Sequence, residues 1–405
     1  MRFTRLAISN WKQFDVVDIE IHPTLTILTG ANASGKTTLL NLLSKHFGWQ
    51  HQELATPAID RVSGAFRFFT RWFKDVLKST DQSIGYLEYS NNSKANLVIP
   101  DQNAPQYQVQ IEGAHGVSGI HIPSHRPVFF FQQITQISTQ KRNTNDAFQS
   151  VTNSMRNRAL GGGDRPTNYY IKETMMSWAI LGFGNQVIPP DEAQKKYYLG
   201  FIDILRKVLP KSLGFRSLEI RNYELVLVTD SGDFMLDSVS GGIGAVIDLA
   251  WQLYLASYEK ADFVVLIDEV ENHLHAVMQR ELLPSFIDAF PTVQYIVSTH
   301  SPLVVGSVKN SHVYALRYNN QNRVFSEKLD LLEKAKSATE ILREVLGVSF
   351  TMPIWVENQL AQVIKKYSGR ELNKEALKDL RTELTAIGLE NLIPETISNL
   401  HSRHD

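Results

Sequence analysis

Residues 30–37 combine the side chains and the spacing needed to hold a nucleoside triphosphate. They read Gly-Ala-Asn-Ala-Ser-Gly-Lys-Thr, a Walker A pattern that lies between a predicted strand and a predicted helix. In such a turn the backbone N–H groups point at the phosphates, Lys36 reaches the β and γ oxygens, and Thr37 helps to hold Mg²⁺. We therefore predict ATP and Mg²⁺ as cofactors, with Lys36 also catalytic. The predicted nucleotide contacts in this turn are Gly30, Asn32, Ser34, Gly35, Lys36, Thr37 and Thr38.

Two adjacent carboxylates follow the apolar run Phe263–Ile267. A strand buried on both faces would deliver them to its carboxyl end, where α/β sheets bind ligands. Asp268 suits Mg²⁺ coordination, and Glu269 is placed to orient or deprotonate the water that attacks the γ-phosphate. An acidic helix N-cap is the alternative for a lone Asp-Glu pair, and the phosphate-binding turn upstream weighs against it.

Two further groups match phosphate chemistry at the ends of a helix and a strand. Ser240, Gly241 and Gly242 precede a long apolar helix, so their hydroxyl and amides form an anion site that the Walker A turn of the same chain does not need. His300 follows the apolar run Val293–Ser298, where its imidazole could bond the γ-phosphate and the attacking water. Taken alone, a plain turn and a helix-capping histidine are the alternatives.

Strands and helices of the expected order surround these motifs. Alternating apolar residues predict strands at Phe3–Ile8, Val16–Ile21 and Leu25–Leu28, and the third runs into the Walker A turn and a helix. Helical spacing also follows the second and third motifs, from Ile243 and from about His275. Because buried strands alternate with helices, we predict an α/β sheet of the doubly wound type.

The segments between the motifs predict additional strands and helices. Three alternating runs at 84–112 predict a β-meander, and the polar, glycine-containing stretch 138–168 predicts a long mobile connection before two or three helices that end near 210. The last eighty or so residues are mostly helical in pattern. We therefore divide the chain into an ATPase domain at 1–320, which contains the meander and the 138–210 insertion, and a helical region at 321–405.

Two of the motifs read Val-Leu-Ile-Asp-Glu-Val-Glu-Asn-His-Leu-His and Ser-Thr-His-Ser-Pro. With these residues and in this order, the four motifs resemble the ABC-type ATPase heads of SMC, Rad50 and RecF proteins. They are most similar to the OLD-like (overcoming lysogenization defect) ATPases, many of which serve in bacterial anti-phage systems. The resemblance covers residues 1 to about 320. It implies an α/β, ABC-type head with a mixed central sheet, an antiparallel β subdomain and a helical subdomain, followed here by a small helical C-terminal region.

The resemblance also implies how the site is completed. In that family the signature serine of one subunit contacts the γ-phosphate held by the other subunit, so Ser240 would act in trans across a head-to-head homodimer with two ATP molecules. By the same comparison Asn272–His275 occupy the D-loop position and His300 is the switch histidine. Ala33, Ile243 and Val270 depart from the residues that are common in the family. None of the three departures removes a catalytic group.

Some positions stay open at the level of sequence. Gln132 and Gln133 are Q-loop candidates by position, and Arg126 is a candidate phosphate or subunit contact, with a plain surface location as the alternative for each. Trp11, Lys12 and Phe14 lie where related heads place adenine-contacting residues, although an aromatic residue at the end of a first strand is usually core.

Composition limits the class of protein. The chain has 43% hydrophobic and 20% charged residues, which is typical of a soluble globular protein, and no cysteine, which fits a cytoplasmic location. No apolar run reaches the roughly 20 residues needed to cross a bilayer. Because the net charge is only -1, any DNA contact must be local. The basic residues between Lys141 and Arg165 are the candidate for it, with a solvated loop as the alternative.

We therefore expect an Mg²⁺-dependent ATPase that works as a homodimer or higher homo-oligomer. It would serve as the sensor or regulatory subunit of an anti-phage or DNA-associated complex with a separate effector, a nuclease or toxin. The effector is expected to be separate because the sequence shows no complete nuclease motif: Trp355–Asn358 only faintly resembles the start of a TOPRIM nuclease. A RecF- or Rad50-like repair ATPase is one alternative, weakened by the lack of heptads between 44 and 171. A nucleotide-locked scaffold with little hydrolysis is the other.

Overall fold

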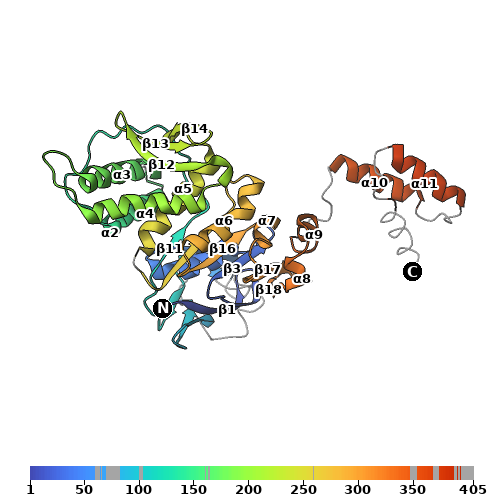
Figure 1. Cartoon of the computed structure of the whole chain (residues 1–405). Helices are drawn as coiled ribbons and strands as arrows, with labels where there is room; N and C mark the ends of the chain where they lie inside the picture. The colour runs from blue at the N-terminus through green and yellow to red at the C-terminus, as the bar shows by residue number, and fades with distance from the viewer. Residues whose placement is uncertain are drawn as a thin grey trace. The chain divides into compact units, whose positions relative to one another are not determined.

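The computed structural model describes residues 1–59, 64, 66–69, 83–99, 104–159, 161–162, 165–258, 260–346, 354–367, 374–386, 390 and 393. The chain divides into two compact units, Met1–Ile341 and Leu342–Asp405. The first unit carries a large sheet and a group of helices, and the second carries two longer helices (Figure 1). All the predicted chemistry therefore lies in the first unit.

Eleven strands form the central sheet, in the order β10-β8-β7-β1-β2-β18-β17-β3-β16-β15-β11. The strands are β1 (Phe3–Trp11), β2 (Phe14–Glu20), β3 (Leu25–Gly30), β7 (Ser83–Tyr89), β8 (Lys94–Val98), β10 (Gln110–Glu112), β11 (Gly119–Ile122), β15 (Phe263–Ile267), β16 (Val293–Thr299), β17 (His312–Tyr318) and β18 (Val324–Lys328). The segment β17-β3-β16-β15-β11 is parallel, and β10-β8-β7-β1-β2 is antiparallel. The sheet is therefore mixed, as predicted.

The parallel strands bring three motifs to one edge of the sheet. Strands β3, β15 and β16 are buried along their whole length, in keeping with their mostly apolar sequences. Since parallel neighbours end on the same side, the segments after Gly30, Ile267 and Thr299 meet there. Helix α1 (Lys36–Ser44) begins at the same edge and is anchored by four fully buried leucines, Leu39, Leu40, Leu42 and Leu43.

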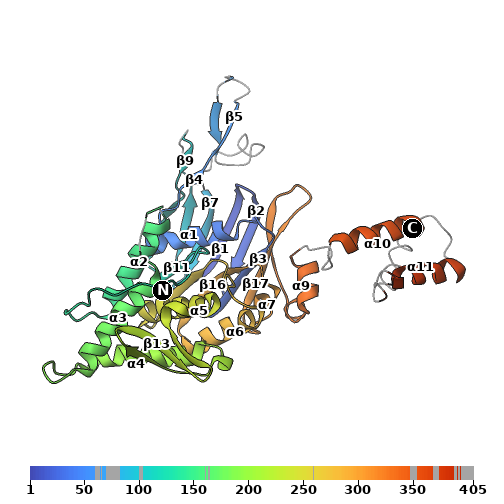
Figure 2. The same ribbon diagram turned by 90° about the horizontal axis from the view of Figure 1, so that it is seen from above.

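The predicted meander exists but differs in two respects. Strands β7, β8 and β10 are antiparallel neighbours, yet β7 also pairs with β1, so they extend the central sheet instead of forming a separate subdomain. The third predicted run is split, because β9 (Gln106–Tyr107) pairs with β4 (Glu53–Leu54) and only β10 pairs with β8. Strand β5 (Thr56–Ile59), which pairs with β6 (Phe66–Phe69), extends beyond this part of the sheet (Figure 2).

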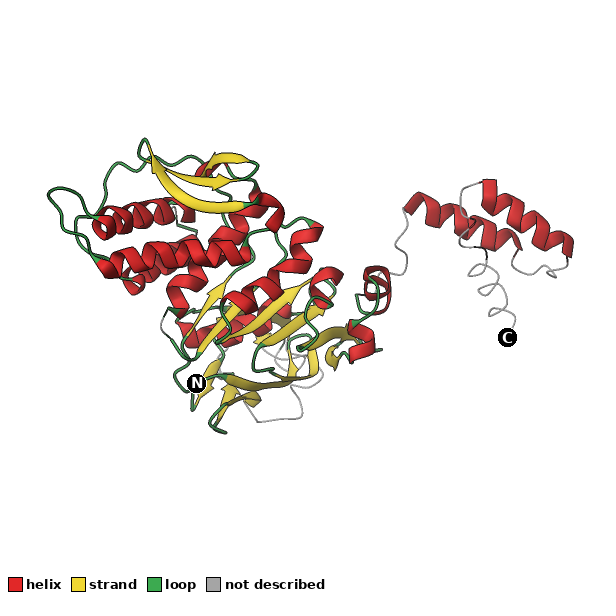
Figure 3. Cartoon of the chain, viewed as in Figure 1, coloured by secondary structure: helices red, strands yellow, loops and turns green. Residues whose placement is uncertain are grey.

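A helical lobe with a small antiparallel sheet precedes the Asp-Glu strand. Its elements are α2 (Thr144–Ala159), α3 (Thr167–Phe183), α4 (Glu192–Val208), η2 (Lys211–Leu213), β12 (Phe215–Arg221), β13 (Glu224–Thr229), β14 (Gly232–Met235), η3 (Leu236–Ser238) and α5 (Gly241–Ser257), and Figure 3 shows the three strands beside the helices. Aromatic side chains hold α5 in place: the Trp178 and Trp251 rings are 5.4 Å apart, and Phe201 packs edge-on against Trp251. The helix that follows Ser240 is thus firmly packed.

Helix α2 corrects the prediction of a long mobile connection at 138–168. It buries Ala147, Val151 and Met155, a stripe at helical spacing, and it begins with a reciprocal cap. Asn143 Oδ1 accepts from the backbone N–H of Asp146, and Asp146 Oδ2 accepts from that of Asn143. The polar composition of the segment hid both signals. Gly163, part of the glycine run used for that prediction, lies outside the described residues.

The C-terminal boundary also differs from the predicted one at 320. Strand β18 completes the sheet by pairing with β17 and β2, so the first unit continues to Ile341. The remaining elements of the chain are η1 (Lys45–Phe47), α6 (Ala276–Ala289), α7 (Pro302–Val305), α8 (Leu331–Lys334), α9 (Ala338–Glu344), α10 (Ile354–Tyr367) and α11 (Lys374–Ala386). Within the second unit, α10 and α11 share a core of Leu360, Val363, Tyr367, Leu380 and Leu384. Among the described residues, no helix is long and apolar enough to span a membrane.

Acid is expected to destabilise the first unit through His121 on β11. This side chain is 2% exposed, neither ring nitrogen has a hydrogen-bond partner in the described part of the chain, and burial lowers its pKa to about 3. The unfolded chain binds this proton below about pH 6.5 and the folded chain does not, so stability falls from there toward pH 3. Between pH 7 and pH 5 the loss is about 2 kcal/mol.

Urea unfolding at both pH values measures this loss. His121→Leu should lose less stability on acidification than the wild type, whereas the same change at the exposed His125 should leave the pH dependence as it is. Equal pH dependence in wild type and His121→Leu would show that His121 is not the cause.

Candidate nucleotide-binding site

The turn between β3 and α1 needs its two glycines. Gly30 and Gly35 have φ values of 143° and 96°, and a Cβ at either position would come within 2.5 Å of the Leu316 carbonyl oxygen or 2.4 Å of the Phe14 ring. Ala33, which stands where related proteins often have glycine, has φ 62°. This left-handed conformation costs an alanine about 1–2 kcal/mol. The neighbouring strands β2 and β17 therefore fix the shape of the turn.

Lys36 is folded onto its own turn. Its Nζ donates to the carbonyl oxygens of Gly30 at 3.1 Å and Ala31 at 3.0 Å, and the side chain is buried. Burial lowers the pKa of Lys36 to about 8, and the carboxylates of Asp268, Glu269 and Glu271 oppose the shift. An ammonium group with only neutral carbonyl partners is well prepared to move onto phosphate oxygens.

Thr37 and Asp268 lie side by side at the end of β15. Thr37 Oγ1 donates to Asp268 Oδ2 at 2.8 Å, and Ser298 Oγ donates to Asp268 Oδ1. A hydroxyl and a carboxylate oxygen beside a phosphate site are ligands that Mg²⁺ prefers, since it is usually held by one or two protein oxygens together with substrate phosphates. The two residues predicted as metal ligands therefore fit Mg²⁺. No cluster of three or more acidic or histidine side chains among the described residues could hold a metal by itself.

Glu269 has an unusual backbone. Its φ is 46°, a left-handed conformation that is uncommon for a side chain of this size. Its N–H donates to Ser298 Oγ at 2.8 Å, so Ser298 fixes Asp268 and Glu269 together. From the sequence, Ser298 is predicted only as the last residue of a strand, without a role in the site.

His300 is tied to the same turn. Its backbone N–H donates to Glu271 Oε1 at 2.6 Å. Burial lowers the pKa of the His300 imidazole, with the charge of Lys36 as the second cause. A neutral imidazole can both accept and donate a hydrogen bond, as a group between a phosphate and a water must. The structure thus brings Lys36, Thr37, Asp268, Glu269 and His300 to one edge of the sheet.

Ser240, Gly241 and Gly242 lie at the start of α5, and Ser240 is the N-cap, with its Oγ accepting from the N–H of Ile243 at 3.5 Å. Ser240 and Gly241 are exposed, and a Cβ at Gly241 would meet nothing within 4 Å. No hydrogen bond among the described residues joins this helix start to the 30–37 turn. The serine is therefore open to a partner from outside.

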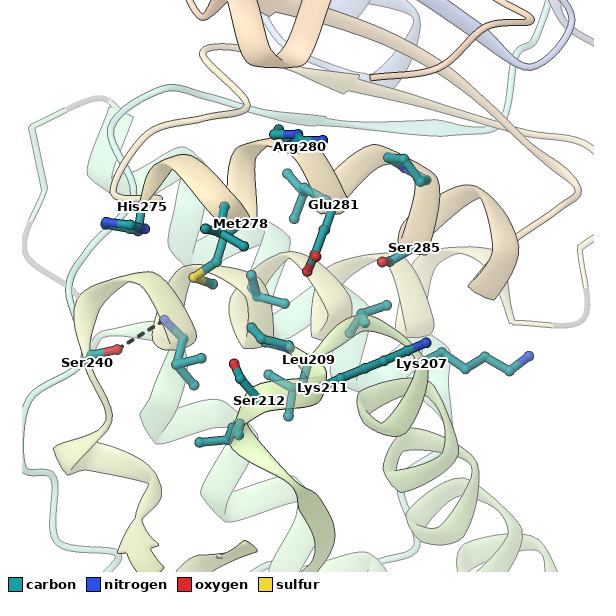
Figure 4. A pocket seen from close by; sticks show the side chains of 18 of the residues that line it. Lys207, Leu209, Lys211, Ser212, Ser240, His275, Met278, Arg280, Glu281 and Ser285 are labelled. Carbon is teal, nitrogen blue, oxygen red and sulfur yellow. Dashed lines mark hydrogen bonds between the residues drawn. The ribbon is translucent and has the colours of Figure 1, made fainter. Parts of the chain in front are cut away.

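A groove of about 800 Å³ adjoins Ser240 between α6 and the end of α4. Ser240 and His275 lie at one end of this groove, and Lys207 lies at the other (Figure 4). It contains no residue of the 30–37 turn. The nucleotide turn and the groove are thus separate features of the first unit.

The two aromatic residues that were candidates for adenine contacts belong to the hydrophobic core. Trp11 and Phe14 are fully buried, and the indole N–H of Trp11 donates to Tyr107 Oη at 3.0 Å. The Phe14 ring lies against Gly35, so it supports the phosphate turn from behind.

The basic candidates for DNA contact are largely engaged within the chain. Lys141 pairs with Asp191 at 2.6 Å, and Arg142 pairs with Glu173 at 2.9 Å. Arg156 donates to the carbonyl oxygen of Phe47. These contacts favour a structural use of the basic residues over a phosphate-tracking surface.

A buried ion network holds the Q-loop candidate segment. Lys172 is fully buried, and its Nζ donates to Gln132 O and to Asp237 Oδ2, both at 2.6 Å. The N–H of Gln132 also donates to Asp237, and Asn168 Nδ2 donates to the carbonyl oxygen of Phe130. Gln132 is thus fixed beside the loop that leads to Ser240. Sequence reasoning missed Lys172 and Asp237, because nothing in their spacing shows that they meet.

Comparison with known proteins agrees with this geometry. A family profile described as "AAA domain, putative AbiEii toxin, Type IV TA system" matches residues 25–306, and one described as "P-loop containing region of AAA domain" matches residues 3–45. The chain belongs to this AAA-domain family. Residues 25–306 are therefore an ATP-binding ATPase domain.

Individual relatives of this AAA-domain protein match over shorter stretches. "Septu protein PtuA" of Bacillus mycoides is 25% identical over 202 residues, which cover 49% of this chain and 25% of the relative. "Retron Ec83 probable ATPase" of Escherichia coli is 29% identical over 126 residues, or 28% of this chain and 23% of the relative. The matched segments thus span about a quarter of these relatives. Among solved structures, the SMC head domain from Thermotoga maritima aligns with a TM-score of 0.41 and 14% identity over 82% of this chain and 100% of that one.

Proposed function

We propose that this ATPase domain hydrolyses Mg²⁺-ATP at two sites that form when two copies meet head to head, and that it serves as the regulatory subunit of a complex with a separate effector. The observation that carries the proposal is the position of Ser240. It caps an exposed helix start that makes no hydrogen bond to the 30–37 turn, whereas the other predicted groups gather around that turn. An exposed helix start capped by a serine can bind a phosphate that another copy holds.

The residues at the sheet edge divide the chemistry among them. Lys36 would leave the carbonyl oxygens of Gly30 and Ala31 for the β and γ oxygens of ATP. Glu269 would accept the proton of the attacking water, and His300 would bond both that water and the γ-phosphate. Ser240 of the second copy would supply a hydroxyl and a helix N-terminus to the same phosphate.

Thr37 and Asp268 are the residues that would hold Mg²⁺. The ion neutralises charge on the phosphate oxygens during transfer. Ser298 orients the Asp268 carboxylate and fixes the N–H of Glu269, so both carboxylates are positioned by one hydroxyl.

The regulatory role rests on the relatives. Two carry the names of a Septu protein and a retron ATPase, and both are aligned over only part of their length. Together with the resemblance to OLD-like ATPases, these names favour a subunit of an anti-phage system over a repair ATPase. DNA is the weaker partner proposal, because Lys141, Arg142 and Arg156 are engaged within the chain.

ATP hydrolysis measured against protein concentration in the presence of Mg²⁺ tests the proposal. The rate per chain should rise with concentration until the sites are paired, and light scattering should show that ATP doubles the mass. A rate per chain that stays constant while the mass stays that of a monomer would contradict shared sites. Tight ATP binding without hydrolysis would favour the scaffold alternative.

A further inference from the structure

Arg126 is buried beside the turn that carries the predicted general base. It follows β11, which pairs in parallel with β15, so the chain leaves the sheet next to Asp268 and Glu269. Its side chain is 7% exposed. Nη2 donates to the carbonyl oxygen of Glu269 at 2.9 Å and approaches that of Asn272 at 3.4 Å. The predicted alternatives for Arg126, a surface position or a contact with phosphate or a second subunit, do not include these backbone contacts.

The turn formed by residues 269–273 has a strained backbone that hydrogen bonds from Arg126 can stabilise. Glu269 and His273 both have left-handed backbones, with φ values of 46° and 69°, and neither is a glycine. Ser298 Oγ holds the N–H of Glu269, and Arg126 holds its carbonyl oxygen. The peptide groups on both sides of the Glu269 Cα are therefore fixed, which sets the direction in which its carboxylate leaves the backbone.

Several carboxyl groups act on the buried Arg126 guanidinium. Asp248, on α5, is fully buried, and burial raises its pKa while a hydrogen bond from Gln252 and the charge of Arg126 oppose the rise. The charges of Glu271, Asp268 and Glu269 also act on the guanidinium. Two of its nitrogens, Nε and Nη1, are buried and have no hydrogen-bond partner among the described residues. A buried guanidinium in this state is costly unless the surrounding carboxylates compensate it.

We infer that Arg126 is a positioning residue: it holds the Glu269 backbone in the orientation needed for hydrolysis. The inference rests on the proposed function, because it gives Arg126 no contact with ATP and acts only through Glu269.

Arg126→Met and Arg126→Lys test this role. Arg126→Met should lower kcat by about 10- to 100-fold, the usual effect of a misplaced catalytic group, with a change in KM of less than about threefold. Arg126→Lys, which keeps the charge but cannot bridge two carbonyls in the same plane, should fall between it and the wild type. Hydrogen exchange of the amides from 269 to 274 should quicken in Arg126→Met without nucleotide.

Arg156→Met is the matched control, because Arg156 also donates through Nη2 to a backbone carbonyl oxygen, that of Phe47. It should leave exchange at 269–274 and kcat unchanged. Equal exchange in wild type and Arg126→Met, or a loss of ATP binding as large as the loss of turnover, would overturn the inference. If the wild type binds ATP and does not hydrolyse it, the proposed function fails by itself, and the exchange rates still decide whether Arg126 holds this turn.

Discussion

Glu269→Gln is expected to lower kcat by about 10²- to 10⁴-fold, the usual contribution of a general base. The amide keeps the shape of the side chain but cannot take a proton from the attacking water. ATP should still bind, because Lys36 and Thr37 are unchanged and the N–H of residue 269 still reaches Ser298. Steady-state hydrolysis together with equilibrium binding of ATP measures the two effects separately.

The same variant should accumulate as an ATP-bound dimer, because closure of the sites is no longer followed by hydrolysis. Glu192→Gln is the matched control, since the Glu192 side chain is 83% exposed and lies at the start of α4. It should behave as the wild type in both assays. Wild-type turnover by Glu269→Gln would remove Glu269 from the mechanism.

Ser240→Arg is expected to reduce hydrolysis at least about 100-fold, which is the usual effect of removing a group that stabilises charge in the transition state. The binding of ATP to isolated chains should be preserved. The new side chain would fill the open surface at the start of α5 and replace the hydroxyl that is proposed to meet the other copy's phosphate. Because Ser240 makes no hydrogen bond to the 30–37 turn, binding within one chain should not change.

Light scattering with ATP should then show monomers for Ser240→Arg. Ser118→Arg is the control for a new surface cation. Ser118 is exposed and directly precedes β11, so it lies at the amino end of a parallel strand, whereas the site lies at the carboxyl ends. It should dimerise and hydrolyse as the wild type does. If Ser240→Arg keeps full activity, Ser240 has no part in the site.

The motifs and the buried strands could be predicted because their signals are local. The runs at β3, β15 and β16 are mostly apolar and fully buried, and each leads directly into one motif: the 30–37 turn, Asp268-Glu269 or His300. Strand order could not be predicted in the same way. Whether β7 starts a separate sheet or pairs with β1 depends on contacts between residues about 80 positions apart, and hydrophobic alternation is the same in both cases.

The residues that support the site were mostly missed. Arg126 was a candidate phosphate or subunit contact, with a surface location as the alternative, and its burial depends on β11 lying beside β15. Ser298 and Glu271 stood inside quoted motifs, but their hydrogen bonds to Asp268 and to the His300 N–H exist only once parallel strands place them together. Helix α2 is different, since its cap and its apolar stripe were both present in the sequence.

Mixing Lys36→Ala with Ser240→Arg tests most directly whether each site is shared between two copies. Each variant alone should be inactive, the first because it cannot bind ATP and the second because it cannot complete its partner's site. A mixed dimer pairs the intact 30–37 turn of one copy with the intact Ser240 of the other. Because one of the two sites in each mixed dimer is intact, activity should return to at most about half of the wild-type rate per chain. A mixture as inactive as its components would contradict the shared site.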